Sequence, residues 1–245
     1  MDLISIDIGF FYILFVVFFF SFLQSFLGIG LLIFGTPTLL LLGYEYSYVL
    51  SIILPCSIAL SFLQSYQNLN KVYGAKYLYV YTLPSLSIGL LIILNTSLEI
   101  DIIKMIGLIL FIITIIRINK KLNHFFHTMV NKYTVVYSIL IGLIHGFFNM
   151  SGAFLAIFMS TTNKSAAKAR VSIAYWYLIF ALIQTIILII TNNFYFSYLT
   201  IFLILISIIS HLFVNFTILK KINNKIFQKI ITLVVFSYSL FCLLS

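Results

Sequence analysis

Long runs of apolar residues, separated by short polar stretches, dominate the chain. The polar stretches leave ten apolar segments, which are 8–27, 31–43, 47–69, 77–95, 101–117, 133–149, 152–162, 169–191, 197–216 and 226–244. The runs are continuous and do not alternate in polarity, a pattern that favours α-helices over the strands of a membrane barrel. We therefore expect an all-α polytopic membrane protein.

Two of these segments are too short to cross a bilayer, because a spanning helix needs about 20 apolar residues. Segments 31–43 and 152–162 each follow a longer segment across a sequence that weakens helices. These linking sequences are Gly28-Ile29-Gly30 and Asn149-Met150-Ser151-Gly152. We expect two re-entrant hairpins, each of which enters the membrane and turns back. The hairpins would cover residues 8–43 and 133–162.

Three crossings follow each hairpin, and with each hairpin counted as one span there are about eight spans in all. Since three is odd, the second half is inverted relative to the first. The predicted repeats are 1–117 and 133–245, joined by a basic cytoplasmic loop at 118–132. Inverted repeats with broken helices at mid-membrane are typical of secondary transporters, in which one half rocks against the other.

The two halves are also weakly related in sequence. An offset of 121 residues pairs Gln24 with His145, Gly28 with Asn149 and Gly30 with Ser151, and an offset of 120 pairs Gln64 with Gln184. These pairs place matching polar residues at and after the two breaks.

Charge placement supports this threading, because cytoplasmic loops collect Lys and Arg. With both termini outside, every basic residue except Lys104 falls in a cytoplasmic segment, and all five acidic residues fall outside. The net charge of +9 therefore indicates topology and attraction to anionic lipid. It does not indicate a nucleic-acid partner.

Composition excludes a water-soluble enzyme. The chain is 63% hydrophobic and 8% charged, whereas soluble domains are about 25% charged. The first apolar run follows Asp2 and Asp7 with no Lys or Arg, so it is expected to be a retained span and not a signal peptide. Cys56 and Cys242 lie in separate apolar runs and are expected to be packing residues, with no disulfide, metal or cofactor.

A hairpin tip inside the membrane leaves backbone N–H and C=O groups without helical partners, so it should line a cavity. The N-termini of the returning half-helices, near Gly30 and Ser151, would favour an anion. Charged residues lie only near span ends, so neutral groups would hold that anion. The predicted substrate-binding residues are Gln24, Gly28, Gly30, Gln64, Asn149, Ser151, Gly152 and Gln184, with Ser25, Thr36, Ser61 and Thr185 as further polar candidates.

Each of these residues also has a purely structural reading. Glycines let helices pack closely in membranes, and polar side chains often bond between helices. Trp176 and the Tyr residues near span ends, Tyr46 among them, are expected to form an interfacial belt.

His145 is the candidate for coupling to a proton, because it lies one helical turn before Asn149 and imidazole titrates near neutral pH. A neutral His bonded to a neighbouring helix is the alternative. His145 and Ser151 are not expected to share a helix face, since a helix break separates them. With no H-E-x-x-H and no paired intramembrane Asp, no enzyme is expected.

At its two hairpins the chain resembles the sulfite exporter TauE/SafE family of membrane permeases. The stretch 26–30, with Pro37 nine residues after Gly28, is similar to the family's L-G-I-G-G-G-x-x-x-x-P pattern. Residues 147–152 are similar to its F-G-I-S-G variant, and 167–182 to its A-x-R-A-T/S entry into the following helix. The chain departs from these patterns at three glycine positions, occupied by Leu31, Leu32 and Asn149.

The resemblance implies transport of sulfite, sulfonates or related small anions through an eight-span fold in the inner membrane of a bacterium. Its partners would be the lipid bilayer and the anion, and a homo-oligomer is compatible with the sequence. The alternative is a non-transporting membrane subunit or assembly factor, although the loop 118–132 is too short to form a domain. A primary pump is disfavoured because no phosphate-binding loop is found.

Overall fold

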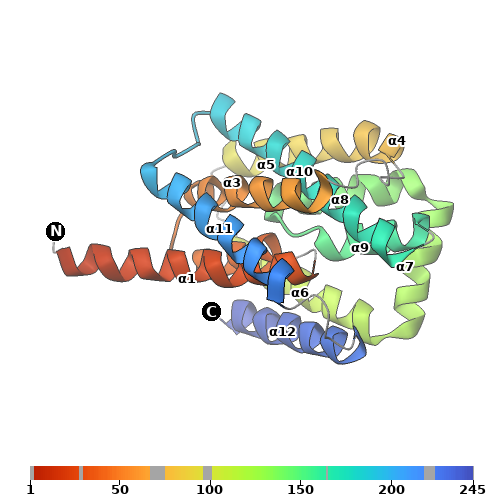
Figure 1. Cartoon of the computed structure of the whole chain (residues 1–245). Coiled ribbons are helices and arrows are strands. Elements are labelled where there is room, and N and C mark those ends of the chain that lie inside the picture. The colour runs from red at the N-terminus through yellow and green to blue at the C-terminus, as the bar shows by residue number, and fades with distance from the viewer. Residues whose placement is uncertain are drawn as a thin grey trace.

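A computed structural model describes residues 3–27, 30–66, 75–95, 101–163, 165–217 and 224–244, and the structural statements below refer to these residues. Their regular structure is entirely helical (Figure 1). The first half contains α1 (Leu3–Leu27), η1 (Leu31–Gly35), α2 (Thr36–Leu41), α3 (Tyr46–Ser65), α4 (Ala75–Tyr77), η3 (Leu78–Thr82), α5 (Leu83–Asn95) and α6 (Ile102–Ile118). Both η elements are π-helical turns.

The second half contains α7 (Lys120–Lys132), α8 (Thr134–Phe148), α9 (Gly152–Thr162), α10 (Ala166–Ile190), α11 (Tyr198–Thr217) and α12 (Asn224–Leu244). These bounds lie close to those of the apolar segments, because a continuous apolar run in lipid satisfies its backbone only as a helix.

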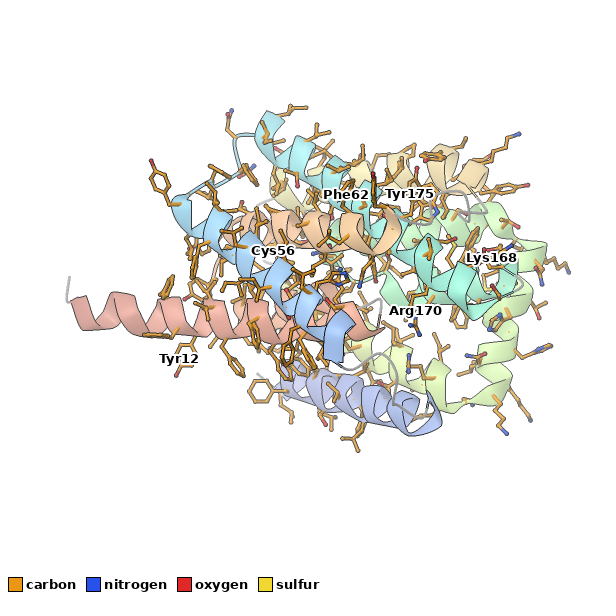
Figure 2. All side chains as sticks on the ribbon, viewed as in Figure 1. Tyr12, Cys56, Phe62, Lys168, Arg170 and Tyr175 are labelled. Carbon is orange, nitrogen blue, oxygen red and sulfur yellow. The ribbon has the colours of Figure 1, made fainter. Side chains whose placement is uncertain are left out.

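Helices α3 and α10 pack against each other at the centre of the bundle, and α11 and α5 flank them. Outer pairs are α1 with α11, α5 with α8, and α6 with α12. Within its most apolar stretch α3 is 67% buried, against 33% for Leu78–Asn95, so α3 belongs to the core and α5 to the periphery. Apolar side chains such as Tyr12 and Phe62 point outward from the bundle (Figure 2).

Three helical stretches are long and apolar enough to cross a membrane: Tyr46–Ser65, Leu78–Asn95 and Lys168–Ile190. A fourth candidate arises if α6 and α7, which meet at 102°, are counted as one broken span. The apolar stretches described in the other helices are shorter, at 10–17 residues, such as Gly9–Ser25 within α1 and Tyr198–Val214 within α11. The described residues are thus all-helical with three or four candidate spans by length, which is consistent with a membrane protein, and the eight spans stay a prediction.

The 118–132 segment differs from the expected loop, because most of it forms helix α7. Asn119 starts this helix by accepting hydrogen bonds from the backbone N–H groups of Lys121 (2.9 Å) and Leu122 (3.2 Å). The inner face of α7 covers α9, with the Phe126 ring 5.8 Å from that of Phe154. The apolar residues of α7 recur at a spacing that places them on one helix face, and Lys, Asn and His lie between them in the sequence. The mean hydropathy of this mixed segment therefore did not indicate a helix.

The chain turns back at both breaks. In the first half, the Tyr44 hydroxyl after α2 donates to the Gly9 carbonyl near the start of α1, over 3.4 Å. In the second half, Thr161 Oγ1 at the end of α9 lies 2.5 Å from Nδ1 of His127 on α7, the helix that precedes α8. Each returning helix therefore ends close to the part of the chain that leads into its hairpin.

Candidate functional site

The first break, between α1 and η1, is closed by its own side chains. Gln24 Oε1 accepts from the N–H of Leu31 (3.2 Å), so the first donor of the returning segment is satisfied. A Cβ on Gly30 would lie 2.6 Å from the backbone nitrogen of Gln24, so only glycine permits this approach. Leu31 and Leu32 are both fully buried and fill the space beside the break.

The second break, between α8 and α9, has a different geometry. Asn149 ends α8 in the left-handed conformation (φ 59°), and its N–H bonds to the His145 carbonyl over 2.8 Å. Ser151 Oγ lies 2.9 Å from His145 Nδ1. The two residues lie on either side of a helix break and were not expected to share a helix face, yet the reversal of the chain at the break brings Ser151 back over His145.

Two glutamines brace the two breaks from the neighbouring helices. Gln64 Nε2, near the end of α3, donates to the Gln24 carbonyl over 2.9 Å. Gln184 Nε2, on α10, donates to the His145 carbonyl over 3.4 Å. Gln24 Nε2 also reaches Ser61 Oγ on α3, at 3.4 Å. Each break is thus tied to the helix that follows its own hairpin.

The two breaks meet in the middle of the protein. Asn149 Nδ2 donates to Thr36 Oγ1 of α2 over 3.1 Å, and both side chains are fully buried. A Cβ on Gly152 would lie 2.6 Å from the Ile33 side chain of η1 and 1.9 Å from the hydroxyl of Tyr177 on α10. Residues from the two hairpins, far apart in sequence, therefore form one centre.

Several buried polar atoms near this centre have no hydrogen-bond partner within the described structure. They are Gln64 Oε1, His145 Nε2, Asn149 Oδ1, Tyr177 OH and Gln184 Oε1. An unpaired buried polar group costs about 1–3 kcal/mol, so such groups in a cluster point to a site that receives a polar ligand.

Comparison with known families agrees with this geometry. A family model described as Sulfite exporter TauE/SafE matches residues 13–241. The chain belongs to the sulfite exporter TauE/SafE family. This confirms the resemblance drawn from the two hairpins and makes the protein a member of a family of membrane transporters. No curated protein and no solved structure matches the chain.

The backbone explains one departure from the TauE/SafE glycine pattern. Asn149 stands at a glycine position and has a positive φ of 59°, a conformation that asparagine tolerates better than other non-glycine residues. Its side chain then adds the contact with Thr36 that a glycine lacks. Leu31 and Leu32, at the other two glycine positions, directly follow the break, and both side chains are fully buried.

Some predicted site residues of this TauE/SafE protein do not reach the centre. The hydroxyls of Ser25 and Thr185 bond to carbonyls of their own helices, those of Ser21 and Ala181. Gly28 lies outside the described residues. Charged groups are also distant: Asp101 and Lys104 form an exposed ion pair over 3.0 Å.

Tyr177 is the residue at the centre that the sequence analysis missed. Aromatic residues of this region were expected at the membrane surface, yet Tyr177 is 1% exposed and Trp176 and Tyr46 are also buried. A usable signal was present, since Tyr177 lies seven residues before Gln184 and so on the same face of α10. Among the described residues no group of His, Cys, Asp and Glu could hold a metal ion.

Proposed function

We propose that this protein is a secondary transporter of a small, sulfur-containing anion such as sulfite or a sulfonate, working by alternating access around the two helix breaks. The observation that carries the proposal is the buried contact between Asn149 and Thr36, which joins the two breaks over 3.1 Å amid unpaired polar atoms. A site at such a junction is exposed to one side or the other when the two halves rock.

Helix packing supports the inverted repeat on which this mechanism depends. The pairing of α1 with α11 has its counterpart in α8 with α5, and that of α3 with α11 in α10 with α5. The pairs α3 with α10 and α6 with α12 each join a helix to its own counterpart. Exchange of the two halves therefore leaves these contacts unchanged, as expected for a pseudo-two-fold axis between them.

The residues assigned to the site are those around the two breaks, namely Gln24, Gly28, Gly30, Gln64, Asn149, Ser151, Gly152 and Gln184. Neutral donors in a buried site can hold an anion strongly, because the local dielectric is low. His145 is the group proposed to couple a proton. Its Nδ1 faces Ser151, while its Nε2 is unpartnered and would gain or lose a hydrogen toward the site.

We place the protein in a bacterial inner membrane, with about eight spans when each returning hairpin is counted as one, and with both termini outside. The start of α1 and the end of α12 lie at the same end of the bundle (Figure 1). Helix α7 lies at the opposite end in Figure 1, and Lys168 and Arg170 lie towards that end in Figure 2. This separation supports a cytoplasmic location for the basic end.

Reconstituted vesicles provide the test. The uptake and release of sulfite, sulfate, thiosulfate, taurine and simple carboxylates would be measured with wild-type protein, in empty vesicles and with Gly152→Leu, which places a side chain between Ile33 and Tyr177. We expect saturable flux of a sulfur-containing anion with the wild type only. Flux at the level of empty vesicles for every anion, with or without a pH gradient, would remove the proposal.

A further inference from the structure

Helix α9 begins without a side-chain cap. Its first-turn N–H groups, on Gly152, Ala153 and Phe154, have no acceptor within the helix, because the first bond runs from Leu155 to the Ser151 carbonyl. Ser151 makes no capping bond, since its hydroxyl is engaged with His145. These donors and the positive end of the helix dipole therefore point into the centre described above.

The Tyr177 hydroxyl lies against this same helix start. It is so close that a Cβ on Gly152 would lie 1.9 Å from the phenolic oxygen. The residue is 1% exposed, and its hydroxyl has no hydrogen-bond partner within the described structure. A buried O–H donor without an acceptor thus faces backbone N–H donors without acceptors, so an oxygen of an anion would satisfy both.

The described residues of the first break, up to Leu27 and from Gly30 on, do not form this arrangement. Gln24 Oε1 already accepts from Leu31, and the Leu31 side chain is fully buried. The repeat offsets that pair Gln64 with Gln184 and Gly30 with Ser151 also pair Ser57 with Tyr177 and Leu31 with Gly152. The second half has the small Gly152 at its tip and the phenol of Tyr177 on the facing helix. At the matching positions, the first half has the large Leu31 and the serine Ser57.

We propose that the anion is held at the second break alone, by the N–H groups that start α9 together with the Tyr177 hydroxyl, and that the first break is a closed structural element. This inference rests on the anion transport proposed above. Gln24 and Gly30, included above among the residues proposed for the site, then serve it only by closing the first tip and do not contact the substrate.

The same groups define the class of ligand. They are all donors, which suits an oxyanion that only accepts hydrogen bonds. The acidic side chains that the structure describes lie elsewhere, since Glu45 accepts from Ser47 and Asp101 pairs with Lys104. The structure describes no carboxylate at the centre that would neutralise an ammonium group, so sulfite or thiosulfate is preferred over a zwitterionic sulfonate such as taurine.

Binding to the purified full-length protein in detergent tests this inference separately from flux. Trp176 is the single tryptophan and adjoins Tyr177, so its fluorescence reports on the site, and the thermal shift gives a second measurement. The titrants are sodium sulfite, sodium thiosulfate and taurine at constant ionic strength. The variants are Tyr177→Phe, which removes only the hydroxyl, and Ser57→Ala, which removes the matching unpartnered hydroxyl in the first half.

We expect Tyr177→Phe to weaken sulfite binding about tenfold or more, as for loss of a hydrogen bond to a charged group. Ser57→Ala should bind like the wild type, and taurine should bind more weakly than sulfite. Equal weakening by both variants, or no effect of Tyr177→Phe, would overturn the assignment to the second break even if vesicles transport sulfite. Failure of the wild type to bind either oxyanion would also overturn the assignment to the second break. Binding without flux in vesicles would leave this assignment standing and remove only the transport proposal.

Discussion

Ser151 Oγ lies 2.9 Å from Nδ1 of His145, across a helix break that turns the chain back on itself. When Nδ1–H donates to the serine oxygen, the free lone pair of the neutral imidazole lies on Nε2, the nitrogen without a partner in the described structure. The serine thereby orients the ring and fixes which nitrogen can exchange a proton with the site.

Replacing His145 should therefore uncouple transport from pH. In His145→Gln the side chain can still bond to Ser151 but cannot titrate, so we expect flux that no longer changes between about pH 5 and 8. The measurement is initial flux in vesicles across that range. His124→Gln is the matched control, because His124 is exposed on α7. A wild-type pH profile in His145→Gln would exclude the histidine as the coupling group.

Gln184→Met should impair transport with little effect on stability. The Gln184 amide makes one long bond to the His145 carbonyl (3.4 Å), and its Oε1 has no partner in the described structure. Its removal should change the free energy of unfolding by less than about 1.5 kcal/mol. Flux should nevertheless fall at least tenfold, because the brace between α10 and the second break is lost.

The control for this variant is Thr185→Val, whose neighbouring hydroxyl bonds only to its own helix. Both variants would be compared by thermal unfolding in detergent and by flux. Wild-type transport in Gln184→Met would show that the glutamine is a packing residue.

Hydropathy located the helices and the two breaks, because a long apolar run in lipid has one stable backbone conformation. It could not show which faces meet. Helix α1 is apolar on nearly every side, so its sequence does not indicate which face packs inside the protein. The contact between Thr36 and Asn149 joins residues 113 positions apart. Close packing at Gly152 with Tyr177 likewise depends on how α9 and α10 lie in three dimensions.

Asn149 should tolerate glycine better than alanine. Its left-handed backbone (φ 59°) costs alanine about 1–2 kcal/mol, and either change removes the bond to Thr36, worth about 1 kcal/mol. Asn192 is a matched control, because it also has a positive φ (55°) but is exposed after α10. Thermal unfolding should rank Asn149→Ala below both Asn149→Gly and Asn192→Ala. Equal destabilisation by the two alanine variants would mean that the Thr36 contact contributes nothing.

The opposed orientation of the two hairpins predicts where each end of the bundle can be labelled. Glu45, exposed after the first hairpin, lies at the end where α1 begins, because Tyr44 reaches Gly9. Asn192 lies at that same end, since the N–H of nearby Tyr195 bonds to Ser51 near the start of α3. Asn131 on α7 is exposed at the other end of the bundle (Figure 1).

Single cysteines would be introduced at Glu45, Asn192 and Asn131 in a background in which Cys56 and Cys242, both buried, are replaced by alanine. We expect an impermeant maleimide to label the first two positions on intact cells and Asn131→Cys only after permeabilisation, because a hairpin that returns leaves the chain on the side from which it entered. Flux of the background protein checks that it folds. Labelling of Asn131→Cys and Asn192→Cys from the same side would mean that the second hairpin, which lies between them, is a full crossing, and the inverted repeat would then be wrong.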